Sequence, residues 1–409
     1  MKLLFLSFLF ISSLSFANTI EVCASCKVKS IQKAVNLSVD GDTVLVKKGT
    51  YFENDISVNK EIHLKGQGNP IVDGQSKSYI FLISAANFSL SGFTIKNVEQ
   101  SYTKDYAAIK ALKCRNFSIH DNVLENVFFG IMVEKSKYGV VKGNVISSHA
   151  VNEAGSGNGV HMWHCENMRV ENNTVSHLRD GLYFEFVSNS SISNNTSVEN
   201  LRYGLHFMFS NNNVYHHNEF KNNGAGVAVM FSKFIKMHHN SFHFNWGTAS
   251  YGLLLKEIYD AEIHHNYFEQ NTIGINIDGC TRIKYENNFF ERNGWAIKFT
   301  GGCYKNEFRF NNFLSNSFDL SYNSKLNDNL FEANYWSEYT GYDLDKDGIG
   351  DVPYRPVKLF SYIVNQTPET LVLLRSLFVD IINFSEKVSP VFTPDDLVDD
   401  KPLMKQIND

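Results

Sequence analysis

Asparagine residues recur at near-regular intervals through the middle of the chain, and this repeat constrains the fold more than any other feature. Ten of them, mostly followed within two residues by an apolar side chain, lie 22 to 29 residues apart. They are Asn122, Asn144, Asn173, Asn195, Asn218, Asn240, Asn266, Asn288, Asn312 and Asn334. Glycines that precede Ile, Val or Leu keep the same spacing, at Gly130, Gly159, Gly181, Gly204, Gly226, Gly252 and Gly274. A fixed period of this length predicts a stack of similar structural units.

Within each repeat the side chains alternate in character, whereas helical repeats would place apolar residues three and four positions apart. The run from Leu205 to Phe209 is typical, and Asn and Gly separate such runs. Stacked parallel strands lie about 4.8 Å apart, so each repeated Asn can hydrogen-bond to the Asn of the next coil. We therefore expect an all-β protein, a right-handed parallel β-helix (solenoid) with coils of about 22 residues over residues 43–336.

The N-terminal segment has the features of an export signal. Lys2 precedes an apolar run from Leu3 to Phe16, and small residues lead up to Ala17. This pattern predicts a cleavable signal peptide over residues 1–17, with cleavage after Ala17 and an exported mature protein. Residues 18–42 are expected to cap the solenoid, with a short amphipathic helix from Ser30 to Val39.

Composition narrows the possible functions. Lys and Arg number 38 and Asp and Glu number 43, a net charge of −5 without a basic cluster, which argues against a nucleic-acid partner. Export favours disulfides over thiolate metal sites, so a disulfide is the preferred interpretation of Cys23 and Cys26, over a redox pair or half of a metal site. The other four Cys are expected to be core residues.

An acidic motif follows the repeats, in a region assigned to residues 337–366. Asp343, Asp345 and Asp347 alternate, and Gly348 follows them, which matches the start of a calcium-binding loop. Asp351 is the residue expected to complete the site. The motif predicts a structural calcium ion that fastens the C-terminal end of the solenoid, with a metal-free acidic turn as the alternative.

The remaining residues, 367–409, are expected to form an amphipathic helix and an extended docking tail. Thr367 and Pro368 are suited to the start of the helix, which is expected to end near Pro390. Its apolar face can either pack on the end of the solenoid or bind a partner. The predicted partner-binding residues are Leu374, Phe378, Ile381 and, in the tail, Phe392.

Strand alternation also predicts which side chains point outward. The second and fourth residues after each repeated Gly should lie on the outer face, so a patch of His161, Tyr183, Glu185, His206, Met208 and Met230 should form on neighbouring coils. Thioether and imidazole groups together suit copper, especially Cu(I). We therefore name His161, His206, Met208 and Met230 as candidate copper ligands.

Three histidine pairs occupy equivalent positions on consecutive coils, just before the repeated Asn. They are His216-His217, His238-His239 and His264-His265. Neighbouring imidazoles about 5 Å apart could share a borderline metal ion, or they could be solvated polar residues at a turn. On the sequence alone the solvated interpretation is preferred.

An enzyme must also be considered, because parallel β-helices host polysaccharide hydrolases and lyases. Such enzymes need paired carboxylates, or a carboxylate with a basic residue, in a groove. Asp180 beside Arg179, one coil from Arg202, is the nearest approach to such a site. No two-carboxylate constellation stands out, so a non-enzymatic protein is preferred to a secreted carbohydrate-active one.

Several phrases resemble the NosD family, periplasmic β-helix proteins of nitrous oxide reductase maturation. They are His177–Val187 (HLRDGLYFEFV), Asn200–Ser210 (NLRYGLHFMFS), Gly157–His161, Asn334–Trp336, Gly341–Arg355 and Ser389–Asp395. The resemblance covers nearly the whole mature chain. It implies a non-enzymatic accessory protein that works with an ABC transporter, made of permease and ATPase subunits, to assemble the copper centres of nitrous oxide reductase.

The resemblance also implies a copper chaperone lipoprotein as a partner, which gives the Met and His face a role in transient Cu(I) transfer. The C-terminal helix would dock on the permease, so the protein would reach the membrane only through the transporter. The family provides no matched ligand set, so the copper ligands named above remain an inference from the residues.

Overall fold

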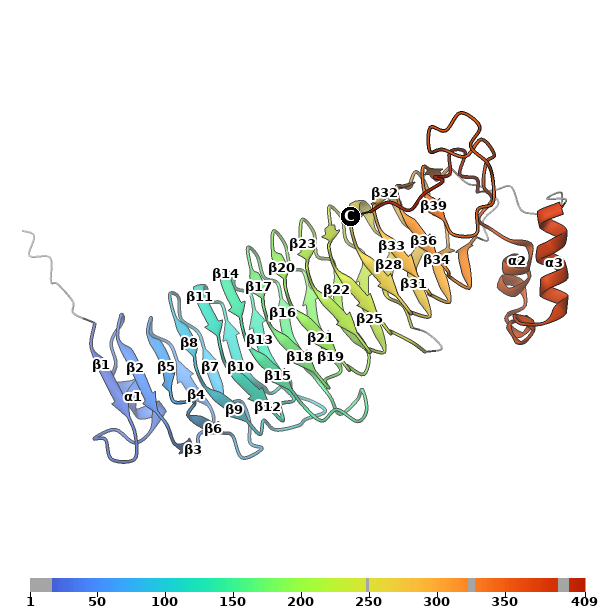
Figure 1. The fold of residues 1–409 in the computed structure, drawn as a ribbon. Coiled ribbons are helices and arrows are strands. Elements are labelled where there is room, and N and C mark those ends of the chain that lie inside the picture. The colour runs from blue at the N-terminus through green and yellow to red at the C-terminus, as the bar shows by residue number, and fades with distance from the viewer. Residues whose placement is uncertain (1–16, 248–249, 323–327, 389–396, 409) are drawn as a thin grey trace, which may run out of the picture.

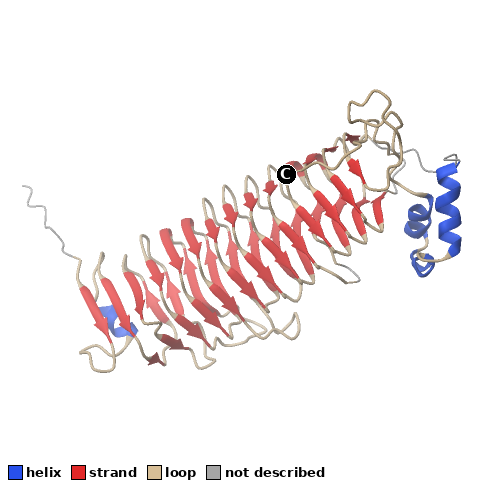
Figure 2. Ribbon diagram, viewed as in Figure 1, coloured by secondary structure: helices blue, strands red, loops and turns tan. Residues whose placement is uncertain are grey.

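Three parallel β-sheets wind together along one axis. The structure is a computed structural model and describes residues 17–247, 250–322, 328–388 and 397–408. Each coil passes through a 12-stranded sheet (sheet 1), a 14-stranded sheet (sheet 2) and a 13-stranded sheet (sheet 3), and every ladder is parallel (Figure 1). Figure 2 shows that strands fill the body of the molecule, while helices lie at its two ends. The predicted right-handed parallel β-helix is confirmed.

The strand bounds show how short each segment is. Sheet 1 contains β4 (Ile56–Val58), β7 (Phe81–Ile83), β10 (Ala107–Leu112), β13 (Phe129–Glu134), β16 (Asn158–Trp163), β19 (Asp180–Glu185), β22 (Tyr203–Met208), β25 (Ala225–Met230), β28 (Leu253–Lys256), β31 (Ile273–Asp278), β34 (Trp295–Thr300) and β37 (Phe318–Ser321). Sheet 2 contains β1 (Thr19–Val22), β2 (Thr43–Lys47), β5 (His63–Gln67), β8 (Ser89–Ser91), β11 (Arg115–His120), β14 (Lys137–Lys142), β17 (Arg169–Glu171), β20 (Ser191–Ser193), β23 (Val214–His216), β26 (Lys236–His238), β29 (Tyr259–His264), β32 (Thr281–Glu286), β35 (Glu307–Arg309) and β38 (Leu330–Glu332). Sheet 3 contains β3 (Thr50–Tyr51), β6 (Ile71–Asp73), β9 (Thr94–Lys96), β12 (Val123–Glu125), β15 (Val145–Ser147), β18 (Thr174–Ser176), β21 (Thr196–Val198), β24 (Glu219–Lys221), β27 (Ser241–His243), β30 (Tyr267–Glu269), β33 (Phe289–Glu291), β36 (Asn312–Leu314) and β39 (Tyr335–Trp336).

Stacked apolar columns form the core, because a single coil is too thin to bury its own side chains. On β22, Leu205 and Phe207 point inward and are fully buried. One inner column of sheet 3 consists of aromatic rings that stack with centroids 4.0 to 5.4 Å apart. Its members are Phe220, Phe242, Phe268, Phe290, Phe313 and Trp336. Burial of such rows supplies the main favourable free energy of folding.

The repeated Asn residues form a continuous hydrogen-bonded column, here called the Asn ladder. Asn218 donates through Nδ2 to Asn240 Oδ1 at 3.0 Å, and Asn240 donates in the same way to Asn266. One predicted member is wrong: Asn288 donates to Asn311, and Asn311 donates to Asn334, so Asn311 rather than Asn312 continues the ladder. A coil of 23 residues, not 24, therefore follows Asn288.

Close packing of neighbouring backbones explains the repeated Gly. A Cβ on Gly204 would lie 2.7 Å from the carbonyl oxygen of Gly226, and one on Gly226 would lie 2.3 Å from that of Gly252. Such distances are far inside van der Waals contact, so a side chain there would force the coils apart.

Coil stacking begins before residue 43. β1 already pairs with β2 in parallel, so part of the predicted 18–42 cap belongs to the first coil. Helix α1 (Ile31–Leu37) follows β1 and buries Ile31. Cys23 and Cys26 form the expected disulfide, and the other four Cys are buried.

The C-terminal segment departs from the expected single helix. Helix α2 (Leu359–Gln366) lies in the region expected to be a loop, a 3-10 helix η1 spans Pro368–Leu373, and α3 (Leu377–Val388) follows (Figure 1). Thr367 makes no side-chain cap hydrogen bond. No helix in the described part of the chain is long and apolar enough to span a membrane.

The end of the chain returns to the solenoid. Leu397 and Asp399 are fully buried, and Leu403 pairs with Tyr335 in a parallel bridge. Residues 397–408, expected to extend toward a partner, thus cover the last coil instead. The physical reason is that the Asn ladder ends at Asn334, so the backbone and side-chain N–H groups of this residue need another acceptor. Asp399 accepts a hydrogen bond from each of them at 3.0 Å.

Candidate metal-binding sites

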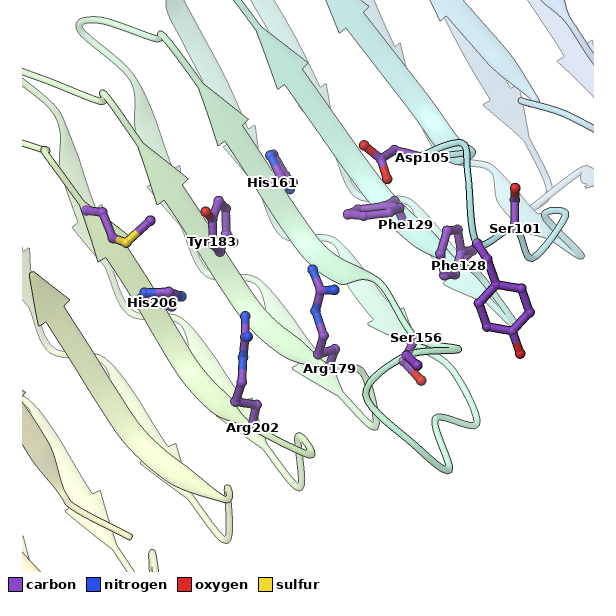
Figure 3. Close-up of a pocket in the computed structure, with 13 residues that line it drawn as sticks. Ser101, Asp105, Phe128, Phe129, Ser156, His161, Arg179, Tyr183, Arg202 and His206 are labelled. Carbon is purple, nitrogen blue, oxygen red and sulfur yellow. The ribbon is translucent and has the colours of Figure 1, made fainter. Parts of the chain in front are cut away.

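The predicted copper face coincides in part with a pocket of about 440 Å³ on the outer side of sheet 1 (Figure 3). Its residues are Ser101, Tyr102, Asp105, Phe128, Phe129, Ala154, Ser156, His161, Arg179, Tyr183, Arg202, His206 and Met208. The floor comes from β13, β16, β19 and β22. The β9–β10 loop and the β15–β16 loop supply the wall.

Strand register brings the predicted side chains into two columns. His161 pairs with Tyr183, and Tyr183 pairs with His206, on three successive coils. Met208 and Met230 are in register in the neighbouring column. These side chains therefore lie on the outer face of sheet 1, the face that the alternation after each Gly predicted.

His206 is the most unusual side chain in the pocket. It is 7% exposed, and neither ring nitrogen has a hydrogen-bond partner among the described residues. Burial lowers its pKa to about 4, with the charge of Asp180 acting in the opposite direction and those of Arg202 and Arg179 acting in the same direction as burial. Its imidazole is therefore neutral at neutral pH, which is the form that binds metal ions. A buried polar group without a partner is destabilising, so a ligand bound by this imidazole would remove an unfavourable contribution.

His161 is held differently. Its Nδ1 lies 3.1 Å from Asn158 Nδ2, and burial lowers its pKa to about 4. The ring of Tyr183 stands between it and His206, with centroids 4.7 Å and 5.1 Å from the two imidazoles. Because Tyr183 separates them, His161 and His206 do not meet at one ion.

The two methionines are half-buried on adjacent coils, and Met208 lies two residues after His206 on β22. Met230 is not among the residues that line the pocket. The candidate set thus divides: His206, Met208 and Met230 lie on two neighbouring strands, while His161 is remote from the methionines. Whether they bind copper stays a prediction.

Arginine side chains give the pocket its polar character. Arg202 binds the fully buried Asp180 in bidentate fashion, at 2.8 Å from Nε and 2.5 Å from Nη2. Arg179 donates to Asn158 Oδ1 at 3.1 Å. Asp180 is therefore held in an ion pair, which argues against the weak acid/base site considered from the sequence.

The three histidine pairs lie at the corner between sheets 2 and 3, and we call this array the His ladder. Within each pair the Nδ1 atoms are 2.9 to 3.0 Å apart. The first members, at positions 216, 238 and 264, are in register, and neighbouring rings stack with centroids 5.0 to 5.1 Å apart. Burial, followed by repulsion from the other imidazoles, lowers the pKa of His238 to about 4.

The acidic loop is compact. One oxygen from each of Asp343, Asp345 and Asp347 lies within 4.8 Å of the others. Asp351 accepts a backbone N–H across the loop at 2.7 Å and is not part of that group. Calcium at this loop therefore stays a prediction, with three of its four named ligands close together.

The predicted partner-binding residues do not share one environment. Phe378 and Ile381 on α3 are exposed, at 54% and 55%. Leu374 instead packs against a small cluster in which Phe360 and Val379 of the helices join Trp295 and Phe318 of the solenoid, so it helps to hold the helical segment on the last coils. Phe392 lies outside the described residues.

Sequence reasoning missed the loop residues of the pocket, such as Ser101 and Asp105, and the contact of Arg179 with Asn158. The loop residues lie outside the repeat, so its period carried no signal for them. Arg179 and Arg202, in equivalent positions of the two longest repeated phrases, were the available signal that arginines line a pocket here.

The family model and the similar proteins that the comparisons found point to the same family. Residues 35–156 and 147–341 match the family described as "Periplasmic copper-binding protein (NosD)". Two curated proteins named "Probable ABC transporter binding protein NosD" are similar over most of their length. The one from Stutzerimonas stutzeri is 25% identical over 87% of this chain and 85% of its own. The one from Pseudomonas aeruginosa is 26% identical over 90% of each chain.

Solved structures with the same fold are more distant in sequence. A family 28 exopolygalacturonase of Yersinia enterocolitica aligns with a TM-score of 0.55 and 10% identity, covering 77% of this chain and 78% of its own. The A-module of a mannuronan C-5 epimerase of Azotobacter vinelandii aligns with a TM-score of 0.51 and 12% identity, covering 76% and 97%. At this identity the likeness extends to the β-helix alone.

Proposed function

The chain belongs to the NosD family of periplasmic copper-binding proteins, and we propose that it is a non-enzymatic accessory protein for assembly of the copper centres of nitrous oxide reductase. In this role it receives Cu(I) in the periplasm, holds it transiently and works with an ABC transporter. Copper is thus its cargo. Export by a signal peptide cleaved after Ala17 is part of this proposal. It rests on the sequence alone, because residues 1–16 lie outside the described structure.

The observation that carries the proposal is the unpartnered imidazole of His206. Neither of its two buried ring nitrogens accepts or donates a hydrogen bond among the described residues. Met208 is on the same face of the strand, and Met230 is in register one coil away, about 4.8 Å along the stack. One imidazole and two thioethers form a soft donor set that suits Cu(I). His206, Met208 and Met230 are therefore the proposed copper ligands.

His161 and the pocket arginines have a different role in this proposal. His161 is satisfied by Asn158, and Arg202 is neutralised by Asp180, whereas Arg179 donates to the uncharged Asn158 and keeps its positive charge. A copper donor protein with an acidic group near its own site would be oriented by this cation. A copper chaperone lipoprotein is the proposed donor, and nitrous oxide reductase is the proposed acceptor.

The transporter contact is proposed at the C-terminal end of the solenoid. Helices α2 and α3 project beyond the last coil (Figure 1), and Leu377, Phe378, Ile381 and Phe384 of α3 are more than half exposed. Contiguous apolar exposure of this kind marks an interaction surface. The relatives are named as transporter-binding proteins, so we assign this surface to the permease, with the ATPase subunits beyond it.

A structural calcium ion at Asp343, Asp345 and Asp347 is a separate part of the proposal. It would stabilise the loop that adjoins the C-terminal cover, where Met404 N donates to the carbonyl oxygen of Gly348. An increase in melting temperature on addition of Ca²⁺, abolished in Asp345→Asn, is expected; an unchanged melting temperature would remove calcium from the account.

Complementation tests the copper role. A strain that lacks this protein should make nitrous oxide reductase with little copper, and the wild-type chain should restore the copper content. The variant His206→Ala/Met208→Leu/Met230→Leu should restore it poorly, whereas Met162→Leu, a fully buried methionine on the inner side of β16, should behave as wild type. Full copper loading by the triple variant would refute the proposed ligands.

A carbohydrate-active enzyme is the second candidate, and one observation favours it. Tyr183, His206 and two arginines line the same pocket, a mixture that could bind an acidic sugar. Incubation with polyuronate substrates distinguishes the candidates: release of unsaturated or reducing ends, lost in Tyr183→Phe, would support the enzyme and contradict the accessory role.

A further inference from the structure

The His ladder has a geometry that a solvated turn does not require. Six of the 14 histidines in the sequence lie in it. On the coils before and after, the same two positions hold Ser193-Asn194 and Glu286-Asn287, which the same backbone accommodates. The second position is left-handed on all of these coils, with φ of 54° at Asn194 and 53° at His265. Asn is sufficient there, so the backbone does not explain three consecutive His pairs.

The two imidazoles of each pair meet nitrogen to nitrogen. Their Nδ1 atoms are 3.0, 3.0 and 2.9 Å apart along the ladder, and the ring planes are nearly perpendicular, at 86°, 87° and 87°. Two nitrogens that share one ion at about 2.0–2.1 Å, with an angle of about 90–110° between the bonds, are about 2.9–3.3 Å apart. The separation observed in each pair lies in this range, which overlaps the length of the N–H···N hydrogen bond that a pair makes without an ion.

The corner that carries the pairs is rigid. The residue after each pair is a buried member of the Asn ladder: Asn240 donates to Tyr215 O at 2.9 Å and to His238 O at 3.1 Å. Asn266 makes the same bonds, to Met237 O on the preceding coil and to His264 O. Because these bonds fix the backbone on both sides of each pair, little order has to be gained when an ion binds.

We propose that the His ladder is a metal-binding site for a borderline divalent ion, with Cu²⁺ preferred, held by two Nδ1 atoms of one pair and completed by water. Imidazole is a ligand for ions of this class, and Cu²⁺ forms the strongest such complexes of the divalent first-row metals. The N–H···N bond of a pair is replaced by two N–metal bonds, and the donor ring moves its proton from Nδ1 to Nε2, so no net proton is released.

Occupancy should be limited to one or two ions. Neighbouring pairs lie 5.0 Å apart by ring centroid, and neutral imidazoles bring no negative charge to offset repulsion between two divalent ions at about that distance. Glu286 is in register with His264 and is the carboxylate next to the ladder in this column. The pair of His264 and His265 is therefore the one that we expect to fill first.

This site is separate from the pocket of the proposed function. The ladder lies between sheets 2 and 3, whereas His206 and the methionines lie on sheet 1, and imidazole selects a harder ion than thioether does. Either site can fail without the other: loss of Cu²⁺ binding to the ladder leaves the Cu(I) pocket intact, and His206→Ala should leave Cu²⁺ binding to the ladder unchanged.

The test is a Cu²⁺ titration of the full mature chain against glycine as competitor, read by equilibrium dialysis and by electron paramagnetic resonance. The variant His217→Asn/His239→Asn/His265→Asn places at each left-handed position the residue that the chain itself uses at Asn194 and Asn287. The matched control is His164→Asn, another exposed histidine with positive φ, of 52°, outside the ladder.

Wild type and His164→Asn should bind about one to two Cu²⁺ with nitrogen hyperfine structure from two imidazoles. The triple variant should bind Cu²⁺ at least ~100-fold more weakly, because loss of a residue that only supports a ligand can already cost that much and this variant removes a ligand from each pair. Should that variant misfold, His216→Ser/His238→Ser/His264→Ser serves in its place, because the chain itself has a serine, Ser193, at the equivalent position of the preceding coil. A wild-type spectrum without imidazole nitrogens, or a well-folded variant with wild-type affinity, would overturn the proposal.

Discussion

Replacement of Asp399 by alanine should loosen the C-terminal end of the β-helix, because this carboxylate terminates the Asn ladder. Its Oδ2 accepts from Asn334 N, Asn334 Nδ2 and Trp336 Nε1, each at 3.0 Å. Its Oδ1 accepts from Ala333 N at 3.2 Å and from Lys401 N at 3.1 Å. The side chain is fully buried, and of its donors on the last coil Asn334 Nδ2 also donates to Phe308 O. Alanine therefore leaves three donors without a partner: Ala333 N, Asn334 N and Trp336 Nε1.

The magnitude follows from those three donors. A buried donor without a partner costs about 1–3 kcal/mol, so the sum lies at about 3–9 kcal/mol before relaxation. Water can reach the end of a solenoid once the tail residues loosen, which places the expected loss at the lower end, about 3–5 kcal/mol. Because each coil contacts only its neighbours, the loss should be local to the last coils.

Hydrogen exchange read by mass spectrometry measures this locally. In Asp399→Ala the amides of β38, β39 and residues 397–408 should lose protection, while those of β16 to β22 keep it. Asp400→Ala is the matched control, since Asp400 is adjacent and exposed and should change stability by less than about 0.5 kcal/mol. Asp399→Asn keeps the shape of the side chain but places an amide N–H donor against the N–H donors of the last coil, so it should also destabilise the C-terminal end of the β-helix. Unchanged protection in Asp399→Ala would refute the reasoning.

Three further predictions concern the pocket, the coil packing and the docking surface. In copper-free protein His206 has a pKa of about 6.5 in the unfolded chain and about 4 in the folded chain, so the free energy of unfolding should fall as the pH is lowered from 6.5 to 4. Urea titrations at pH 7 and pH 5 measure this fall, and His206→Phe should make it smaller by about 2 kcal/mol. Gly204→Val would press on Gly226 O, 2.7 Å from its Cβ, and should cost about 1–3 kcal/mol in urea denaturation. Phe378→Asp/Ile381→Asp should abolish co-purification with the transporter and leave the melting temperature unchanged, since both side chains are exposed.

Each of these has its own control or contrary result. A pH profile of His206→Phe that superimposes on wild type would show that His206 is not buried as described. Gly247→Ala, whose Cβ would meet no atom of the described residues closer than 3.6 Å, should be tolerated where Gly204→Val is not. Retention of the transporter by the α3 variant would move the contact elsewhere on the solenoid.

The fold could be predicted because the repeat is a physical requirement of stacking. Asn240 must pair with Asn218 on one side and Asn266 on the other, which fixes both residue type and spacing. The exception at Asn312 arose where two asparagines are adjacent, and only the observed register shows that Asn311 is the buried ladder member.

The site could be predicted only in part. Alternation placed His206 and Met208 correctly, because a strand has two faces. It did not show that the Tyr183 ring fills the space between His161 and His206, nor that loops cover the face. The contact of Asp399 with Asn334 joins residues 65 positions apart and follows no period. Such contacts depend on where a non-repeating segment returns, which periodicity does not determine.

The central claim, a Cu(I) site built from His206, Met208 and Met230, is tested most directly by anaerobic Cu(I) titration of the mature protein against a competing chelator. The account predicts tight binding of one Cu(I) by wild type and by Met162→Leu, and loss of that binding in His206→Ala/Met208→Leu/Met230→Leu. Wild-type affinity in the triple variant, or no competition with the chelator by wild type, would contradict it.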